Sequence, residues 1–180
     1  KEENMTVTLT NGGGADKVMT AVLSKNADIG LMGPETVIYV KSQGKTDCPA
    51  VIGQMTRCDG AFLLSRKPEP DFKIEDLKGK NILAGRAGGV PAMSFEYILG
   101  ELGLKNNVDY ELNFGVQFNL MTAAFEGGTG DYCTMFEPTA SEYQKSGKGY
   151  IVAAMGELSG EIPYTSFVAL NSYCEKNEKQ

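Results

Sequence analysis

Residues 84–94, AGRAGGVPAMS, decide the fold. Their first residue, Ala84, ends a short apolar run, residues 81–84, which predicts a buried strand. Glycines then form a turn, and Pro91 stands where a helix begins, because a proline at the first helical position loses no hydrogen bond. The predicted helix has one apolar face, made by Phe95, Ile98, Leu99 and Leu102. A buried strand, a glycine turn and a proline-initiated helix are the repeating step of an α/β sheet.

The same step occurs on both sides of this stretch. Residues 27–32 predict a strand before Gly33 and Pro34, and residues 131–136 predict another before Pro138. Further strands are expected at residues 5–10, 50–56, 61–65, 110–114, 150–155 and 166–170. Helices are expected after Gly14, after Gly33, at residues 117–126 and at residues 138–145, with a short helical turn at 74–77. This alternation indicates an α/β protein with mainly parallel, doubly wound sheets.

The composition excludes several classes of function. The 180 residues contain no histidine, which excludes Ser-His-Asp triads, Cys-His dyads and histidine metal ligands. The net charge is −6 and no Lys/Arg cluster occurs, so a nucleic-acid partner is not expected. No stretch approaches the roughly 20 apolar residues of a membrane span. The cysteines have no CxxC spacing, and we interpret all four as buried or incidental thiols, with room for one long-range bridge: Cys48, Cys58, Cys133 and Cys174.

Three strand-to-helix corners are candidate ligand contacts. They lie at residues 33–35, 88–91 and 137–139, where unpaired amides of the first helical turn attract anions and carbonyl groups. Near the second corner Ser94 offers a hydroxyl and Arg86 a charged fork for a planar acid. Neither this corner nor residues 11–14 has the Gly-Lys-Ser/Thr of a phosphate-binding loop, and residues 11–14 are interpreted as an ordinary turn.

The carboxylates at these corners have a structural alternative. Glu35 and Glu137 would lie in or beside the first turn of a helix, where acidic side chains are favoured without any catalytic role. We therefore expect Arg86, Gly88 and Gly89 to matter more for binding than Glu35 does.

Four segments resemble one protein family. ADIGLMGPE at residues 27–35, IEDLKGKNIL at residues 74–83, the loop at residues 85–92 and DYCTMFEPTA at residues 131–140 are similar, in order and spacing, to the solute-binding proteins of ABC importers. The similarity is to the nitrate, sulfonate, taurine and thiamine-pyrimidine-precursor type, whose members are periplasmic or lipid-anchored. IPYTSFVA at residues 162–169 stands where that family's chain returns to its first lobe.

The resemblance implies a two-lobed fold of the type II periplasmic-binding-protein kind. Lobe one would be residues 1–58 plus 166–180 and lobe two residues 59–165, with hinge crossings near 58–66 and 160–166. The family's first strand, its ligand loop and its C-terminal helices have no counterpart here, so the chain is expected to be truncated at both ends. By the same resemblance, ligand contacts fall on Gly33, Pro34, Glu35, Arg86, Ala87, Gly88, Gly89, Ser94, Glu137 and Tyr164.

The function implied is extracytoplasmic capture of a small polar or anionic metabolite for an ABC transporter permease, without catalysis, metal or cofactor. Contact with a membrane would occur only through a lipid anchor or the permease. Two alternatives remain open, because fold alone does not fix function. One is an enzyme of the same fold resembling those of thiamine-pyrimidine synthesis, although the cysteine-rich motif and histidine of that branch are absent. The other is the effector-binding domain of a transcription regulator, although no DNA-binding segment is present.

Overall fold

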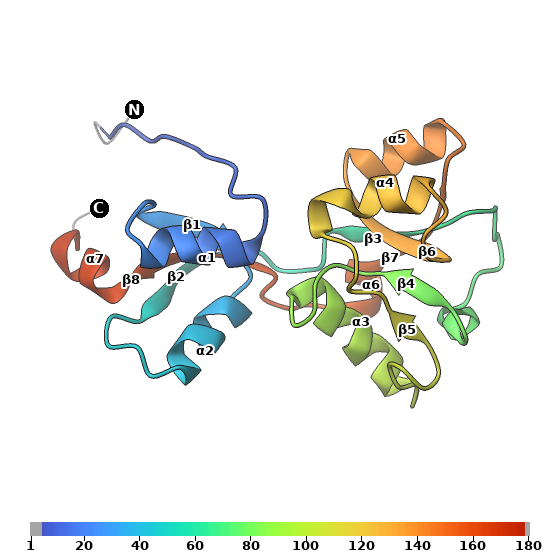
Figure 1. The fold of residues 1–180 in the computed structure, drawn as a ribbon, viewed down its shortest axis with the longest axis horizontal. Helices are drawn as coiled ribbons and strands as arrows, with labels where there is room; N and C mark the ends of the chain where they lie inside the picture. Colours follow the sequence, from blue (N-terminus) through green and yellow to red (C-terminus); the bar gives the residue numbers. More distant parts are fainter. Residues whose placement is uncertain (1–4, 179–180) are drawn as a thin grey trace.

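Two β-sheets, each with its own helices, organise the chain (Figure 1). The computed structural model describes residues 5–178. Within them the first sheet has the strand order β1-β8-β2, and the second has the order β5-β4-β6-β3-β7. We call the first sheet with α1, α2 and α7 lobe one, and the second sheet with the remaining helices lobe two. The two sheets share no strand among the described residues, so each lobe packs its own core.

Lobe one contains α1 (Ala15–Leu23), β1 (Ile29–Met32), α2 (Glu35–Ser42), β2 (Pro49–Thr56), β8 (Thr165–Leu170) and α7 (Asn171–Lys176). Lobe two contains β3 (Ala61–Ser65), η1 (Ile74–Leu77), β4 (Asn81–Leu83), α3 (Val90–Glu101), β5 (Glu111–Leu112), η2 (Phe118–Leu120), α4 (Met121–Glu126), β6 (Tyr132–Phe136), α5 (Thr139–Lys145), β7 (Tyr150–Ala154) and α6 (Met155–Ser159).

Lobe two is a three-layer structure. On one side of its sheet the fully buried Phe95 and Leu99 of α3 pack against Ile82 of β4. On the other side Phe125 of α4 and Ala140 of α5 pack against Cys133 of β6 (Figure 1). The inner strands β3, β4 and β6 therefore bury side chains on both faces, which explains why their sequences are nearly continuous apolar runs.

Lobe one has a smaller core. Met19 and Val22 of α1 pack with Met32 and Val168 on one face of the sheet. The other face leaves apolar side chains such as Ile29 and Leu31 substantially exposed. Strand β1 lies at an edge of this sheet, because β8 is its one hydrogen-bonded neighbour within residues 5–178.

Strand pairing is antiparallel in lobe one and mixed in lobe two, so the expected mainly parallel pairing needs correction. In lobe one β8 inserts between β1 and β2 and pairs antiparallel with both. In lobe two β4 pairs parallel with β5 and β6, but β3 pairs antiparallel with β6 and β7. Both inserted strands adjoin a passage between the sheets: β3 follows the first crossing and β8 follows the second. A returning strand enters a sheet from the opposite direction, and local sequence patterns do not reveal this.

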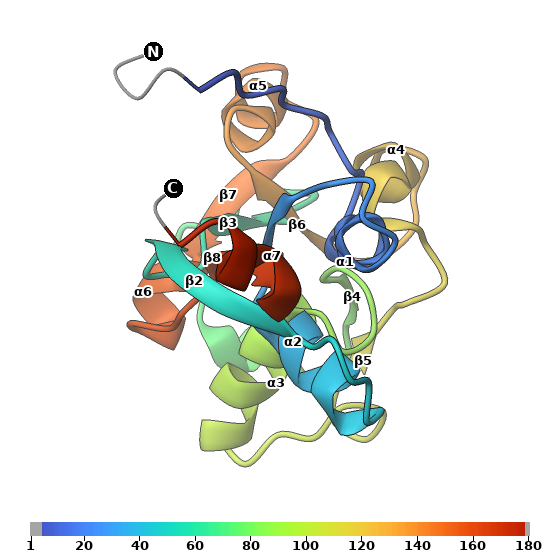
Figure 2. The same ribbon diagram turned by 90° about the vertical axis from the view of Figure 1, so that its left-hand side faces the viewer.

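The strand expected at residues 5–10 is wrong. These residues form no ladder with any described strand, and the chain runs away from the sheet in both views (Figures 1 and 2). Val7 and Leu9 are 83% and 87% exposed. Residues 11–14 form the expected turn, in which the Asn11 side chain accepts a hydrogen bond from the Gly13 amide at 2.9 Å.

The chain passes between the sheets twice. The first passage lies between β2 and β3, and the second between α6 and β8 (Figure 1). Backbone hydrogen bonds from Ile162 to Arg57 and from Tyr164 to Thr56 hold the two passages side by side. All four cysteines fall within the described residues and all four are free thiols. No helix in residues 5–178 is long and apolar enough to cross a membrane.

Candidate functional site

Glu35 lies between the first turns of two helices from different lobes. It is the first residue of α2, and its side chain is only 6% exposed. It approaches Val90, the first residue of α3, whose backbone amide lowers the pKa of the carboxyl group. Gly33 makes the approach possible, because a Cβ atom there would lie 2.0 Å from Glu35 Oε2 and 2.8 Å from Val90 Cγ2.

The charge of Glu35 is only partly compensated. Burial raises the pKa of this carboxyl group, and the backbone amides and Arg86 offset part of that increase. Arg86 Nη2 lies 3.3 Å from Glu35 Oε1, while Arg86 Nε lies 3.8 Å from Asp16 Oδ1. One guanidinium group thus faces two carboxylates, one at the start of α2 and one in the first turn of α1.

A hydrogen bond also joins the lobes beside this corner. The Tyr39 hydroxyl of α2 donates to the Gly88 carbonyl at 2.8 Å. Gly88 has φ +69°, a conformation that other residues rarely adopt, and a Cβ there would lie 2.9 Å from the Tyr39 oxygen. The loop before α3 is therefore held against α2.

Asp59 is a buried carboxylate that the sequence analysis missed. It lies in the first passage between the sheets, is 6% exposed and accepts a hydrogen bond from the Ala61 amide at 2.8 Å. Burial raises the pKa of its carboxyl group, whereas the Ala61 amide and the nearby hydroxyls of Tyr164 and Ser94 lower it. In the sequence Asp59-Gly60 resembles a simple turn between two strands, so the burial was not foreseen. The position of Asp59 at the predicted hinge was the one feature of the sequence that could have marked it as a site residue.

Glu35, Asp59, Ser94 and Tyr164 form what we call the inter-lobe cluster. Burial raises the pKa of Tyr164 far above that of a free tyrosine, and the charges of Asp59 and Glu35 raise it further. The cluster combines the start of α2, the first passage, the first half of α3 and the end of the second passage. It draws one polar side chain from each of four separate parts of the fold.

Three atoms of this cluster are buried without a hydrogen-bond partner among the described residues: Glu35 Oε2, Ser94 Oγ and Tyr164 Oη. The two hydroxyls lie near Asp59 but outside hydrogen-bonding geometry. Each unsatisfied buried group costs about 1–3 kcal/mol, and native proteins retain few of them. Three such atoms in one cluster indicate a place where polar groups from outside the chain would be stabilised.

The other predicted site residues have different surroundings. Pro34 precedes α2, and Gly89 precedes α3 with its amide donating to the Arg86 carbonyl at 3.1 Å. Ala87 is exposed. Glu137 is also exposed, and its carboxylate accepts hydrogen bonds from the Ser141 amide and hydroxyl at 3.2 and 2.8 Å. Glu137 therefore stabilises the start of α5, and its carboxylate is not joined to the inter-lobe cluster.

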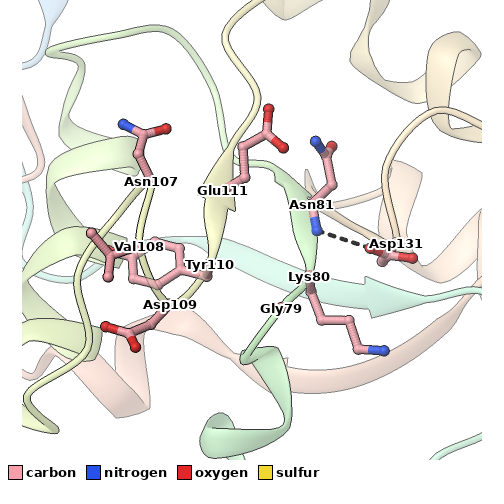
Figure 3. Close-up of a pocket in the computed structure, with 9 residues that line it drawn as sticks. All are labelled: Gly79, Lys80, Asn81, Asn107, Val108, Asp109, Tyr110, Glu111 and Asp131. Atoms are coloured by element: carbon pink, nitrogen blue, oxygen red, sulfur yellow. Dashed lines mark hydrogen bonds between the residues drawn. The ribbon is translucent and has the colours of Figure 1, made fainter.

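An open pocket lies elsewhere in lobe two (Figure 3). It has a volume of about 350 Å³ and is lined by residues 79–81, 107–111 and 131. These residues adjoin the amino ends of β4, β5 and β6, whereas ligands of open α/β sheets bind beyond the carboxyl ends. No predicted site residue lines it. Across residues 5–178 no group of three or more His, Cys, Asp or Glu side chains could hold a metal ion.

The fold is that of the periplasmic ligand-binding proteins of ABC transport systems. The alkanesulfonate-binding protein SsuA from Xanthomonas axonopodis pv. citri, solved with bound MOPS, superposes with a TM-score of 0.74 at 20% identity, over 91% of this chain and 55% of that chain. The nitrate-binding protein NrtA from Synechocystis PCC 6803 superposes with a TM-score of 0.73 at 15% identity, over 93% and 48% of the respective chains. These similarities confirm the two-lobed type II fold expected from the sequence.

A sequence relative accompanies these structural ones. YtlA of Bacillus subtilis (strain 168), provisionally named a binding protein, is 44% identical over 178 residues. The match covers 99% of this chain and 53% of YtlA, so the chain spans about half the length of this relative. No protein-family model matches the chain.

Proposed function

We propose that the chain captures one small polar metabolite between its two lobes, outside the cytoplasm, and passes it unchanged to the permease of an ABC importer. The observation that carries this proposal is the set of three unpaired buried atoms in the inter-lobe cluster. A ligand with complementary polar groups would satisfy them, and closure of the lobes would exclude water and strengthen those contacts.

The proposed site comprises the inter-lobe cluster and the corner around it, with Gly33, Arg86, Gly88 and Gly89. The lobes are proposed to move as two bodies, 1–58 plus 166–180 and 59–165, about the crossings near 58–66 and 160–166; residues 1–4 and 179–180 lie outside the described residues. The structural relatives are named as binding proteins, which supports binding without catalysis. A lipid anchor at the outer face of the membrane is part of the same proposal.

A thermal-shift screen of the complete product of this gene tests the proposal. Pools of sulfonates, nitrate, carboxylates, amines and pyrimidines should include at least one that raises the melting temperature. Native mass spectrometry should then recover that ligand intact, bound once per chain. Absence of any shift across broad metabolite pools would refute binding, and chemical conversion of the ligand would favour the enzyme alternative.

A further inference from the structure

The charge balance of the inter-lobe cluster bears on the chemistry of the ligand. Arg86 is the guanidinium beside the cluster, and it is already shared between Glu35 at 3.3 Å and Asp16 at 3.8 Å. Asp59 adds another buried carboxylate with no ion pair among the described residues. Arg86 therefore has little charge left for an anionic ligand, although the sequence suggested it as the anchor for one.

The three unpaired atoms of the inter-lobe cluster favour a ligand that donates hydrogen bonds. A carboxylate oxygen such as Glu35 Oε2 accepts hydrogen bonds and donates none, while the Ser94 and Tyr164 hydroxyls do both. Between unit charges 4 Å apart the interaction is about 4 kcal/mol at an effective dielectric constant of 20. A sulfonate, nitrate or carboxylate placed here would be repelled by Glu35 and Asp59, whereas a ligand N–H group would satisfy the free acceptor.

Aromatic side chains lead from the surface to the cluster. The rings of Phe118 and Phe136 have centroids 6.1 Å apart, and those of Phe136 and Tyr164 are 6.4 Å apart. Phe118 is substantially exposed, whereas Tyr164 is buried beside Asp59. This row provides a flat apolar surface that ends at the inter-lobe cluster. Aromatic faces bind flat rings and cations.

We infer that the ligand carries a cationic or N–H-donating nitrogen group on a flat, apolar body, such as an amidine or an amino-substituted nitrogen heterocycle. This inference rests on the proposed function. The nitrogen group contacts Glu35, Asp59 and the two hydroxyls, and the flat body lies along Phe136 and Phe118. Glu35 is then more important for binding than Arg86, which is the reverse of the order expected from the sequence.

Two probes with the same aromatic ring and opposite charge test the inference. Benzamidine carries a cationic amidinium group on its phenyl ring. Benzenesulfonate carries an anionic sulfonate group on the same ring. Calorimetric titration of the complete gene product should detect benzamidine and, as a neutral member of the class, 4-aminopyrimidine. Benzenesulfonate and nitrate should not bind.

Matched variants locate the site. Glu35→Gln and Asp59→Asn should each weaken benzamidine binding about tenfold or more, because each removes a charge-assisted contact. Glu111→Gln makes the same chemical change in the open pocket of Figure 3 and should leave binding unchanged. Circular dichroism confirms that each variant is folded before it is titrated.

The outcomes separate the inference from the proposed function. Binding of benzenesulfonate without benzamidine would overturn the ligand class and leave the binding function standing. Benzamidine binding that survives both Glu35→Gln and Asp59→Asn would overturn the assigned site. If neither aromatic probe binds, the charge of the ligand from the metabolite screen decides: an anion contradicts the inference, and an amine or aminoheterocycle supports it. If that screen also finds nothing, the proposed function falls with it.

Discussion

At the scale of single residues, Glu35 is an almost fully buried carboxylate, and its Oε2 atom lacks a hydrogen-bond partner within residues 5–178. Its pKa is raised chiefly by burial. A carboxyl group with a raised pKa binds its proton more tightly in the folded state. Its contribution to stability is therefore complete in acid and is lost as the pH rises through the raised pKa.

Glu35→Gln should accordingly raise the melting temperature of the ligand-free protein at neutral pH, because the glutamine cannot ionise. The difference from the natural sequence should shrink as the pH falls below the raised pKa of Glu35 and disappear below the pKa of a free glutamate. Calorimetric melts from neutral to acidic pH measure it. A variant that melts below the natural protein at every pH would show that the Arg86 ion pair outweighs the cost of burial.

Gly33 offers a test of the close approach between the two helix starts. Gly33→Ala would place a methyl group against Glu35 Oε2 and Val90 Cγ2, and overpacking of this kind costs about 1–3 kcal/mol. Gly100→Ala in helix α3 is the control, because a Cβ atom there would meet nothing within 4 Å. This change should stabilise the folded protein by about 0.5–1 kcal/mol. Denaturant unfolding measures both. Equal effects of the two changes would mean that the corner is looser than described.

At the scale of helices and strands, local patterns predicted most elements. The apolar face of Phe95, Ile98 and Leu99 located α3, and the short helical turn at 74–77 coincides with η1. Residues 5–10 alternate like a strand, but a strand requires a hydrogen-bonded neighbour and the described residues supply none. The short helices α6 and α7 were missed, because five or six residues carry too little periodicity to be distinguished from a loop.

Local sequence patterns also predicted only part of the candidate site. Glycine and proline predicted where helices α2 and α3 begin, and the structure brings these two starts together at Glu35 and Val90. The sequence could not show that Arg86 is shared between two carboxylates, or that Glu137 stabilises its own helix. Both facts depend on which helices and strands meet in space, and the local spacing of residues does not predict such contacts.

Helix α2 contacts lobe two through the hydroxyl of Tyr39. We expect this contact to stabilise modestly the arrangement in which α2 lies against the loop before α3. Tyr39→Phe removes one hydrogen bond to the Gly88 carbonyl and should cost about 0.5–1.5 kcal/mol. Tyr97→Phe, on the exposed side of α3, removes a hydroxyl for which no partner occurs among the described residues and should cost nothing measurable. Thermal unfolding of both variants provides the comparison. A loss of stability in Tyr97→Phe alone would contradict this assignment.

At the scale of the whole molecule, two sheets with separate cores are joined by two adjacent passages. Such a design allows the lobes to rotate about the passages without disturbing either core. Saturation with ligand should therefore reduce the radius of gyration measured by small-angle X-ray scattering. Gly33→Ala should reduce the extent of this change, because its methyl group separates the helix starts that closure brings together.

The measurement that tests binding at the inter-lobe cluster most directly is a calorimetric titration of the screened ligand into two tyrosine variants. Tyr164→Phe removes the buried, unpaired hydroxyl of the cluster, and Tyr132→Phe removes a hydroxyl that donates to Glu69 at 2.8 Å in lobe two. We expect Tyr164→Phe to weaken binding by a factor of roughly 2 to 10, the equivalent of one hydrogen bond, while Tyr132→Phe binds as the natural protein does. Undiminished affinity in Tyr164→Phe, with a loss in Tyr132→Phe, would place the ligand away from the meeting of the two lobes.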